Sequence, residues 1–372
     1  MPAGRYADDF TDFEGVAYLN AAYHGALPLV SSAAAQKALE WKQRPYLVRD
    51  EMHFELPDAY RAAAAALIGA RPEDVAVTTS AGDGIALVTA GLDWRDGDEV
   101  VIPAGEFPSN RFPWLALAER GVVVKEVEDL DDLEGALTKR TRVVSTSWVG
   151  YASGRRADIH RLGAQCRARG VLFVVDGTQG IGGLPFDVRQ TAVDVLVCAG
   201  YKWLLGPYGL GFAWISPALA ERLRPPHVNW FAIDGARDFS RLDRCELRTV
   251  PGARRFDRNE PAAFTCTAAG TASLKYLAEI GPAEVSRHVR GLLDRLLAGL
   301  PPAFRTPDWY REETRSNILR LEPVDQSAAQ RAIEALRASR VVVSAREGAL
   351  RISPHLYNGE DDVDRLLEGL SG

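Results

Sequence analysis

From residue 16 to residue 216 the chain alternates short apolar, β-branched runs with stretches of helical apolar spacing. Strands that alternate with helices predict βαβ units and a largely parallel sheet, and so an α/β fold. Apolar runs such as 171–175 and 193–198 fit strands that are covered on both faces. We expect strands within 16–20, 74–80, 98–104, 121–128, 141–149, 171–179, 194–202 and 209–216, and helices within 31–44, 56–70, 112–121 and 158–170.

The C-terminal third has a different pattern, and 372 residues are enough for two domains. Two long helical runs precede a small α+β unit, and the expected elements are helices 262–281 and 283–300, strand 316–323, helix 327–339, strands 341–345 and 349–354, and helix 360–370. We expect a large domain over 16–260 and a small α+β domain from 1–15 and 261–372. Segment 217–260, rich in Arg, Pro and Asp, is expected to be an irregular connection.

The composition excludes several classes of function. A net charge of −6 gives no electrostatic case for nucleic acid. The four cysteines show no paired spacing, so we expect reduced thiols and no bound metal. The N-terminus lacks the apolar run of a signal peptide, and no apolar run approaches the roughly 20 residues of a membrane helix. These features predict a cytoplasmic protein without a membrane partner.

Lys202 stands out in the stretch "CAGYKWLLGPYGLGFAWIS", where it follows an apolar run at the end of an expected strand. Desolvation lowers the pKa of a lysine toward neutrality, which suits a nucleophilic or Schiff-base amine. From this stretch alone the alternative stays open that the stem covers apolar surface while the amine reaches solvent.

Other chemistry-bearing residues follow neighbouring strands. In an open parallel sheet, ligands bind beyond the carboxyl ends of the strands, so these residues should lie close together. The turn 80–84, "SAGDG", opens a helix and offers backbone N–H groups to a phosphate. Phe107, Asp176 and Lys202 follow three further strands. Singly, Phe107 could be core packing and Asp176 a helix cap. Together, a phosphate cradle, an aromatic plate, a carboxylate and a lysine match what pyridoxal phosphate requires.

On these residues the sequence resembles the class V aminotransferase family of fold-type I pyridoxal-phosphate enzymes, whose members include cysteine desulfurases, isopenicillin N epimerases and kynureninases. "VVDGTQG" followed by "AGYKWLLGPYGLGFAW" looks like the family's Asp-x-x-Gln and its Schiff-base lysine with a glycine-rich tail. The resemblance runs over nearly the whole chain. It implies a large domain with a mostly parallel seven-stranded sheet, a smaller α+β C-terminal domain, and pyridoxal 5′-phosphate as cofactor.

The resemblance also implies roles at the cofactor. Lys202 would form the Schiff base, Asp176 would pair with the pyridine nitrogen, and Gln179 would bond the phenolic oxygen. Phe107 would stack on the ring. The phosphate would be held by the N–H groups of Ala81 and Gly82, with the Tyr201 hydroxyl beside them.

Further segments imply a substrate pocket and a partner subunit. "LRISPHLYNGEDDVDRLLEGL" resembles the segment whose arginine, here Arg351, grips the substrate carboxylate. "YLNAAYHG" resembles the N-terminal loop that lines the substrate pocket, so Tyr23 and His24 are candidates. "RRFDRNEPAAF" resembles the stretch that reaches a partner subunit's site, which favours a homodimer.

Of the positions that depart from the family pattern, three bear on the reaction or on the partner subunit. Phe107 stands where desulfurases carry a histidine, and phenylalanine cannot transfer a proton. The loop "VVVSAREGAL" carries Ser344 and no thiol, so we do not expect a persulfide-forming desulfurase. Glu260 stands where many relatives place a threonine toward the partner's phosphate, and an acid there would repel it.

The sequence therefore predicts an enzyme that acts on an α-amino acid or amine through Lys202, most simply an aminotransferase. A lyase or epimerase is the alternative, because the cofactor serves all of these outcomes. A non-catalytic binding paralogue that kept the fold is a further alternative. A plain nucleotide-binding enzyme is disfavoured, because no GxGxxG joins the first strand to its helix.

Overall fold

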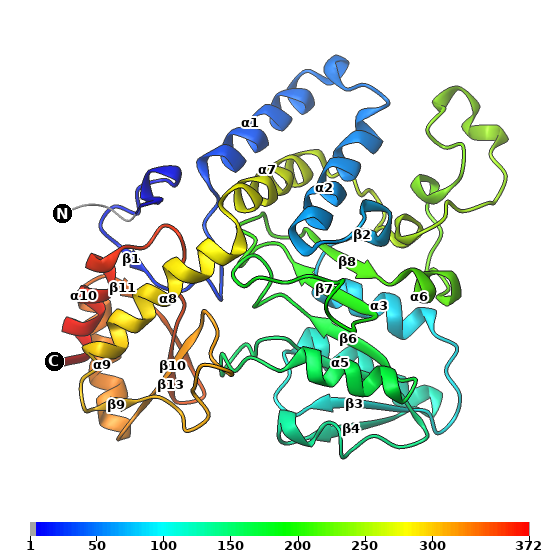
Figure 1. Cartoon of the computed structure of the whole chain (residues 1–372). Helices are drawn as coiled ribbons and strands as arrows, with labels where there is room; N and C mark the ends of the chain where they lie inside the picture. The colour runs from blue at the N-terminus through cyan, green and yellow to red at the C-terminus, as the bar shows by residue number, and fades with distance from the viewer. Residues whose placement is uncertain (1–4, 372) are drawn as a thin grey trace.

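The computed structural model describes residues 5–371 and confirms the α/β fold, with the seven-stranded sheet that the resemblance implied (Figure 1). The strands, in their order across the sheet, are β2 (Val75–Thr78), β8 (Gly211–Ile215), β7 (Val195–Ala199), β6 (Leu172–Asp176), β5 (Thr141–Ser147), β3 (Glu99–Pro103) and β4 (Val123–Val127). β8 runs antiparallel to both of its neighbours, and the other pairings are parallel. The sheet is therefore mostly parallel, as expected.

Helices cover both faces of this sheet. Successive side chains along a strand point to opposite faces, and on each face they pack into an apolar layer. Val174 and Val197 pack in the layer of α3 (Ala81–Gly91), whereas Phe173 and Leu196 pack with α2 (Met52–Ile68) and α5 (Ile159–Ala168). α3 lies so close to β7 that a Cβ at Gly84 would stand 2.6 Å from a Val197 methyl carbon. This close packing fixes where α3 begins, which matters for the site.

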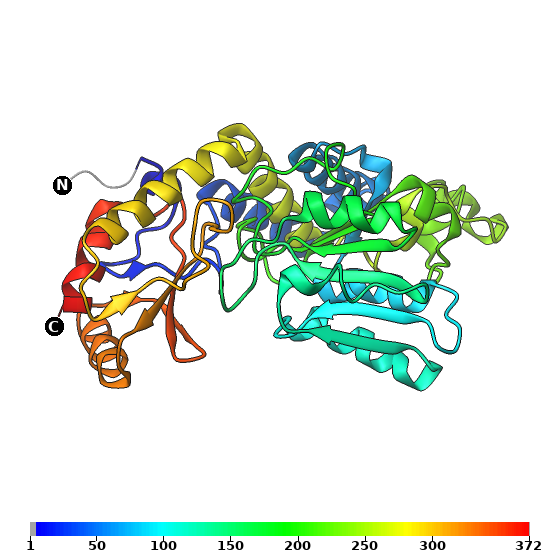
Figure 2. The same ribbon diagram turned by 60° about the horizontal axis from the view of Figure 1, so that its bottom comes forward.

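The C-terminal part is built around a smaller antiparallel sheet that lies beside the large sheet (Figure 2). Its strands, in order, are β12 (Ser344–Arg346), β13 (Ala349–Ile352), β10 (Leu319–Pro323) and β9 (Phe304–Arg305). Its helices are α8 (Pro282–Ala298), α9 (Gln326–Ala338) and α10 (Glu360–Ser371). Among residues 5–371, no helix is long and apolar enough to cross a membrane.

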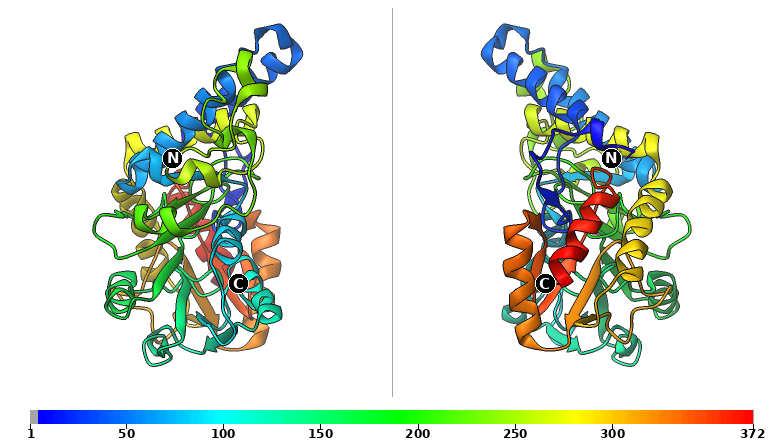
Figure 3. Two further views of the ribbon diagram at one scale, coloured as in Figure 1. Left: turned by 90° about the vertical axis from the view of Figure 1, so that its right-hand side faces the viewer. Right: turned by 90° about the vertical axis from the view of Figure 1, so that its left-hand side faces the viewer.

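The N-terminal segment crosses to this C-terminal part. The expected strand 16–20 shrinks to β1 (Ala17–Tyr18), which pairs in parallel with β11 (Val341–Val342) instead of joining the large sheet. α1 (Leu29–Gln43) and α2 both pack against α7 (Phe264–Ile280), and the end of α1 and the start of α2 project from the body of the molecule (Figure 3). The division into domains at residues 16 and 260 stays a prediction.

Some local expectations were wrong. The helix expected over 112–121 splits into α4 (Phe112–Leu115) and a 3-10 helix over Ala116–Arg120. The strand expected over 341–345 splits into β11 and β12, which pair with different strands. Segment 217–260 is irregular except for α6 (Pro217–Arg222) and three 3-10 helices.

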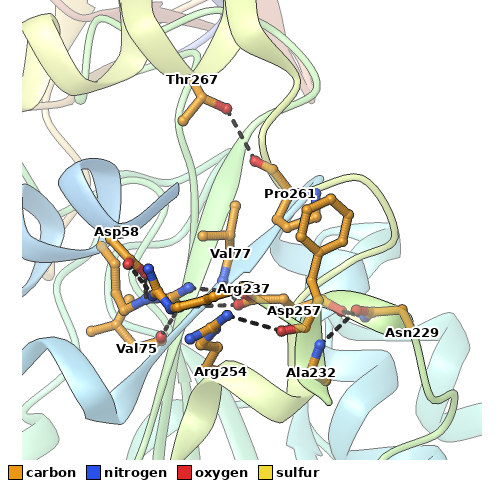
Figure 4. A network of polar contacts seen from close by, with 12 residues as sticks. Asp58, Val75, Val77, Asn229, Ala232, Arg237, Arg254, Asp257, Pro261 and Thr267 are labelled. Carbon is orange, nitrogen blue, oxygen red and sulfur yellow. Dashed lines mark hydrogen bonds and ion pairs between the residues drawn. The ribbon is translucent and has the colours of Figure 1, made fainter. Parts of the chain in front are cut away.

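A buried ion pair fixes the end of this connection to the large sheet (Figure 4). Arg61 of α2 donates to both carboxylate oxygens of Asp257, at 3.0 and 2.8 Å, and also to the Val75 carbonyl. Asp257 Oδ1 accepts from the Val77 amide at 2.8 Å. The Arg258 amide in turn donates to the Val77 carbonyl. Residues 257 and 258 are thus held beside the end of β2, where the candidate phosphate cradle begins.

Candidate functional site

The carboxyl ends of β2, β6 and β7 meet at one cavity of about 350 Å³. Six of the predicted site residues line it: Ala81, Phe107, Asp176, Gln179, Tyr201 and Lys202. The sheet topology therefore brings together residues that lie up to 121 positions apart in the chain, from 81 to 202. Of the other candidates, Gly82, Tyr23, His24 and Arg351 are outside the residues that line this cavity.

Lys202 is buried at the cavity wall, which removes the alternative of an amine that reaches solvent. Its Nζ lies 5.3 Å from the centre of the Phe107 ring and 5.5 Å from that of Tyr201. Burial lowers the pKa of Lys202 to about 8, although the nearby Asp176 opposes the shift. The N-terminal loop passes directly over the backbone of this lysine. Gly25 lies so close that a Cβ there would collide with the Lys202 carbonyl oxygen.

Asp176 and Gln179 are held by bonds that fix their orientation. Asp176 Oδ1 accepts from the Thr178 amide at 2.9 Å, and burial raises the pKa of Asp176. The Trp203 indole, which can only donate, binds Gln179 Oε1 at 2.9 Å, and Gln179 Nε2 donates to the Ala22 carbonyl. The amide of Gln179 is therefore oriented, and one N–H of Nε2 is left to point elsewhere.

The candidate phosphate cradle is the start of α3. Ser80 caps this helix by accepting from the Asp83 amide at 3.1 Å. The amides of Ala81 and Gly82 occupy the first helical positions, which have no acceptor within the helix and favour an anion. Gly82 packs against Ser109, where a Cβ would stand 3.3 Å from the serine Cβ. The cradle thus consists of backbone N–H groups on a helix that the sheet positions.

Arg351 of β13 reaches the cavity wall through Tyr151, which lines the cavity. Its Nη1 donates to the Tyr151 carbonyl at 2.6 Å, and its Nη2 lies 3.3 Å from Ser344 Oγ. Nε is buried and has no hydrogen-bond partner in the part of the chain that the structure describes. Burial, with Arg346 nearby, lowers the pKa of Arg351 to about 10. A guanidinium with an unused donor is suited to bind a carboxylate.

Tyr23 and His24 form an aromatic rim with two residues of the cavity. The ring of His24 lies 4.8 Å from that of Tyr23 and 4.9 Å from that of Tyr201, which is 4.6 Å from Tyr208. Tyr23 and Tyr208 are 53% and 71% exposed, so this rim opens to solvent. Burial and the Lys202 charge lower the pKa of His24.

The sequence analysis did not predict several residues that line the cavity, notably Ser147, Tyr151, Thr178 and Tyr208. Ser147 ends β5 and is paired in register with Asp176, so the strand-end argument could have found it. Tyr151 and Tyr208 lie in loops whose path depends on distant contacts. Glu260 has a positive φ of 56° and is outside the residues that line the cavity.

Comparison with solved structures identifies proteins that share this fold. The chain superposes on a cysteine desulfurase from Thermococcus onnurineus NA1 with a TM-score of 0.84 at 20% identity, covering 99% of this chain and 97% of that one. It superposes on the cystine C–S lyase C-DES with a TM-score of 0.85 at 24% identity, covering 97% and 99%. At these identities the likeness shows a shared fold.

The sequence comparisons then give the family. The family described as aminotransferase class-V matches residues 49–366, and the chain belongs to it. Isopenicillin N epimerase of Streptomyces clavuligerus is 28% identical over 351 residues, which is 88% of each chain. A probable cysteine desulfurase of Methanothermobacter thermautotrophicus is 28% identical over 331 residues, 82% of this chain and 80% of that protein. The predicted family is confirmed, and pyridoxal phosphate, the predicted cofactor, is the cofactor on which its members depend.

Proposed function

We propose that this protein is a pyridoxal-phosphate enzyme that acts on an α-amino acid or amine, with transamination as its reaction. The observation that supports this most is the convergence of Lys202, Asp176, Gln179 and Phe107 on one cavity that also contains the start of α3. When bound, the cofactor would supply an electron sink for the bond broken at the substrate Cα. The retention of this set argues against a non-catalytic paralogue.

Each residue has a distinct role in holding the cofactor. The Ala81 and Gly82 amides, with the Tyr201 hydroxyl, would hold the phosphate. Asp176 would keep a proton on the pyridine nitrogen, and the free N–H of Gln179 would bind the phenolic oxygen. Phe107 would cover the ring face. Lys202 would anchor the cofactor covalently and, once released by the substrate amine, would take the Cα proton as general base. A lysine pKa of about 8 suits this task.

The test is to add a panel of amino acids and amines to the holoprotein and follow its visible absorbance and its products. Formation of a keto acid that keeps the substrate's whole side chain, without release of ammonia, supports transamination. Inversion at Cα without a keto acid would replace transamination by epimerisation, the alternative that the likeness to isopenicillin N epimerase favours. A cleaved side chain would indicate a lyase, whether the rest of the substrate appears as a keto acid with ammonia or as a smaller amino acid. No spectral response to any amine would overturn the proposal.

Arg351→Ala is expected to weaken binding of carboxylated substrates by about 1.5–3 kcal/mol, the scale of a hydrogen bond to a charged group. Simple amines, which lack the carboxylate, should change much less. The measurement is KM or Kd for an amino acid and for its decarboxylated amine. Arg346→Ala on the neighbouring strand β12 is the matched control. Equal losses for both ligands would remove Arg351 from the substrate site.

We further propose a homodimer, since residues 255–264 resemble the stretch that reaches a partner's site. Light scattering at micromolar concentration should give twice the mass of one chain. A monomer mass at that concentration would contradict the proposal.

A further inference from the structure

Glu106 is a buried carboxyl group beside the cofactor cavity to which neither the sequence nor the proposed reaction gives a role. It directly precedes Phe107, the residue proposed to stack on the cofactor ring, and it is only 9% exposed. Its Oε1 lies 2.6 Å from the Ser147 amide nitrogen, and its Oε2 lies 2.6 Å from Ser147 Oγ. Both oxygens of this carboxyl are thus directed at one serine.

Ser147 connects Glu106 to the cofactor cavity. Ser147 lines that cavity, and it also lines a second cavity of about 200 Å³ whose wall includes Glu106. At the other side, Ser147 of β5 is paired in register with Asp176 of β6. Paired residues on parallel strands lie about 4.8 Å apart and point to the same face. Glu106, Ser147 and Asp176 therefore stand in a row across the end of the sheet.

Burial is the main reason that Glu106 favours its neutral form. Burial, together with the nearby Asp176 carboxylate, raises the pKa of Glu106 to about 7, although the hydrogen bonds of Ser147 and Asn110 oppose the shift. Thr146 Oγ1 lies 3.5 Å from Oε1. Glu128, Tyr151 and Arg155 line the second cavity. Two carboxylates so close together repel, and Lys202 stabilises the charge on Asp176, so the proton belongs on Glu106.

We propose that Glu106 stores a proton and exchanges it with the Asp176 end of the cofactor cavity through Ser147 Oγ. This inference rests on the proposed cofactor site. Glu106 O–H donates to Ser147 Oγ while the serine's own proton passes to Asp176, directly or through one water. Glu106 is then a carboxylate that accepts from the serine amide and hydroxyl, and water in the second cavity returns its proton. Glu106 is a positioning residue, since it acts through Ser147.

Such a proton store answers a need that the sequence creates. Relatives with a histidine plate carry a titratable group on the ring face, whereas Phe107 has none. Among the residues that line the cavity, Lys202 is then the only one whose protonated side chain is a cation. A neutral acid next to the plate supplies a second proton carrier without adding negative charge beside Asp176.

Infrared spectroscopy of the cofactor-free protein tests the stored proton. Glu106→Gln keeps the geometry, because an amide can accept from the Ser147 amide and donate to its hydroxyl. The difference spectrum between wild type and this variant should contain the C=O band of a protonated carboxylic acid at pH 6, and the band should disappear with a midpoint near pH 7. Absence of the band at pH 6 would overturn the proposal. This readout needs no cofactor, so it is independent of the proposed function.

The pH dependence of the holoprotein's visible absorbance tests the exchange. Wild type should show an inflection near pH 7 that is lost in both Glu106→Gln and Ser147→Ala. Glu128→Gln, which removes another carboxylate from the second cavity, should keep it. An inflection that persists in Ser147→Ala would refute the relay through the serine. A wild-type protein that binds no cofactor would overturn the proposed function, while the infrared titration would still decide on Glu106.

Discussion

Lys202→Ala is expected to abolish covalent attachment of the cofactor and to lower turnover by about 10⁴-fold or more, since one residue provides both the anchor and the general base. The physical basis is the position of Nζ, buried beside Asp176 and over the Phe107 ring. Borohydride reduction of the holoprotein followed by peptide mapping measures the attachment, and the label should lie on Lys202 in wild type and be absent in the variant.

Two controls separate chemistry from charge. Lys202→Arg keeps a cation near Asp176 but cannot form the imine, so it should also lose attachment while retaining stability. Lys275→Ala removes an exposed lysine on α7 and should retain both attachment and turnover. A reduced label on another lysine in wild type would show that Lys202 is not the anchor.

The residues of the candidate site were predictable to the extent that their position follows from a strand end. Phe107, Asp176 and Lys202 each follow an apolar run, and a parallel sheet brings such ends together. Arg351 lies in another part of the chain, and only the family resemblance pointed to it. The structure then showed that its Nε has no hydrogen-bond partner among residues 5–371.

The remaining features depend on contacts between distant residues. β1 and β11 have two residues each, which is too short for any periodic pattern, and their pairing joins residues 17 and 341. Burial raises the pKa of Glu106, and its hydrogen-bond partner Ser147 lies 41 positions away. Segment 217–260 has an irregular composition, yet its end is fixed by a partner 196 positions earlier in the chain. Composition cannot indicate such a partner.

Asp257→Asn is expected to destabilise the protein by about 3–5 kcal/mol, because the buried Arg61 charge then keeps only the partly exposed Asp58, 3.7 Å from its Nε, as a counter-charge. The side chains of Arg61 and Asp257 are 4% and 1% exposed, so water cannot replace the lost carboxylate. That loss is large against a typical folding free energy of about 5–15 kcal/mol. Urea unfolding of the cofactor-free protein measures it, through the shift of the midpoint at constant slope.

The ion pair between Arg295 and Asp364 is a matched control, since it has the same two-bond geometry, at 2.7 and 2.8 Å, but its side chains are 42% and 41% exposed. Asp364→Asn should therefore cost no more than about 1 kcal/mol. Adding Arg61→Met to Asp257→Asn removes the buried charge that has lost its main partner, while the asparagine oxygen can still accept from the Val77 amide. The double variant should recover most of the lost stability. If Asp257→Asn costs no more than Asp364→Asn, the connection 217–260 is held by something other than this ion pair.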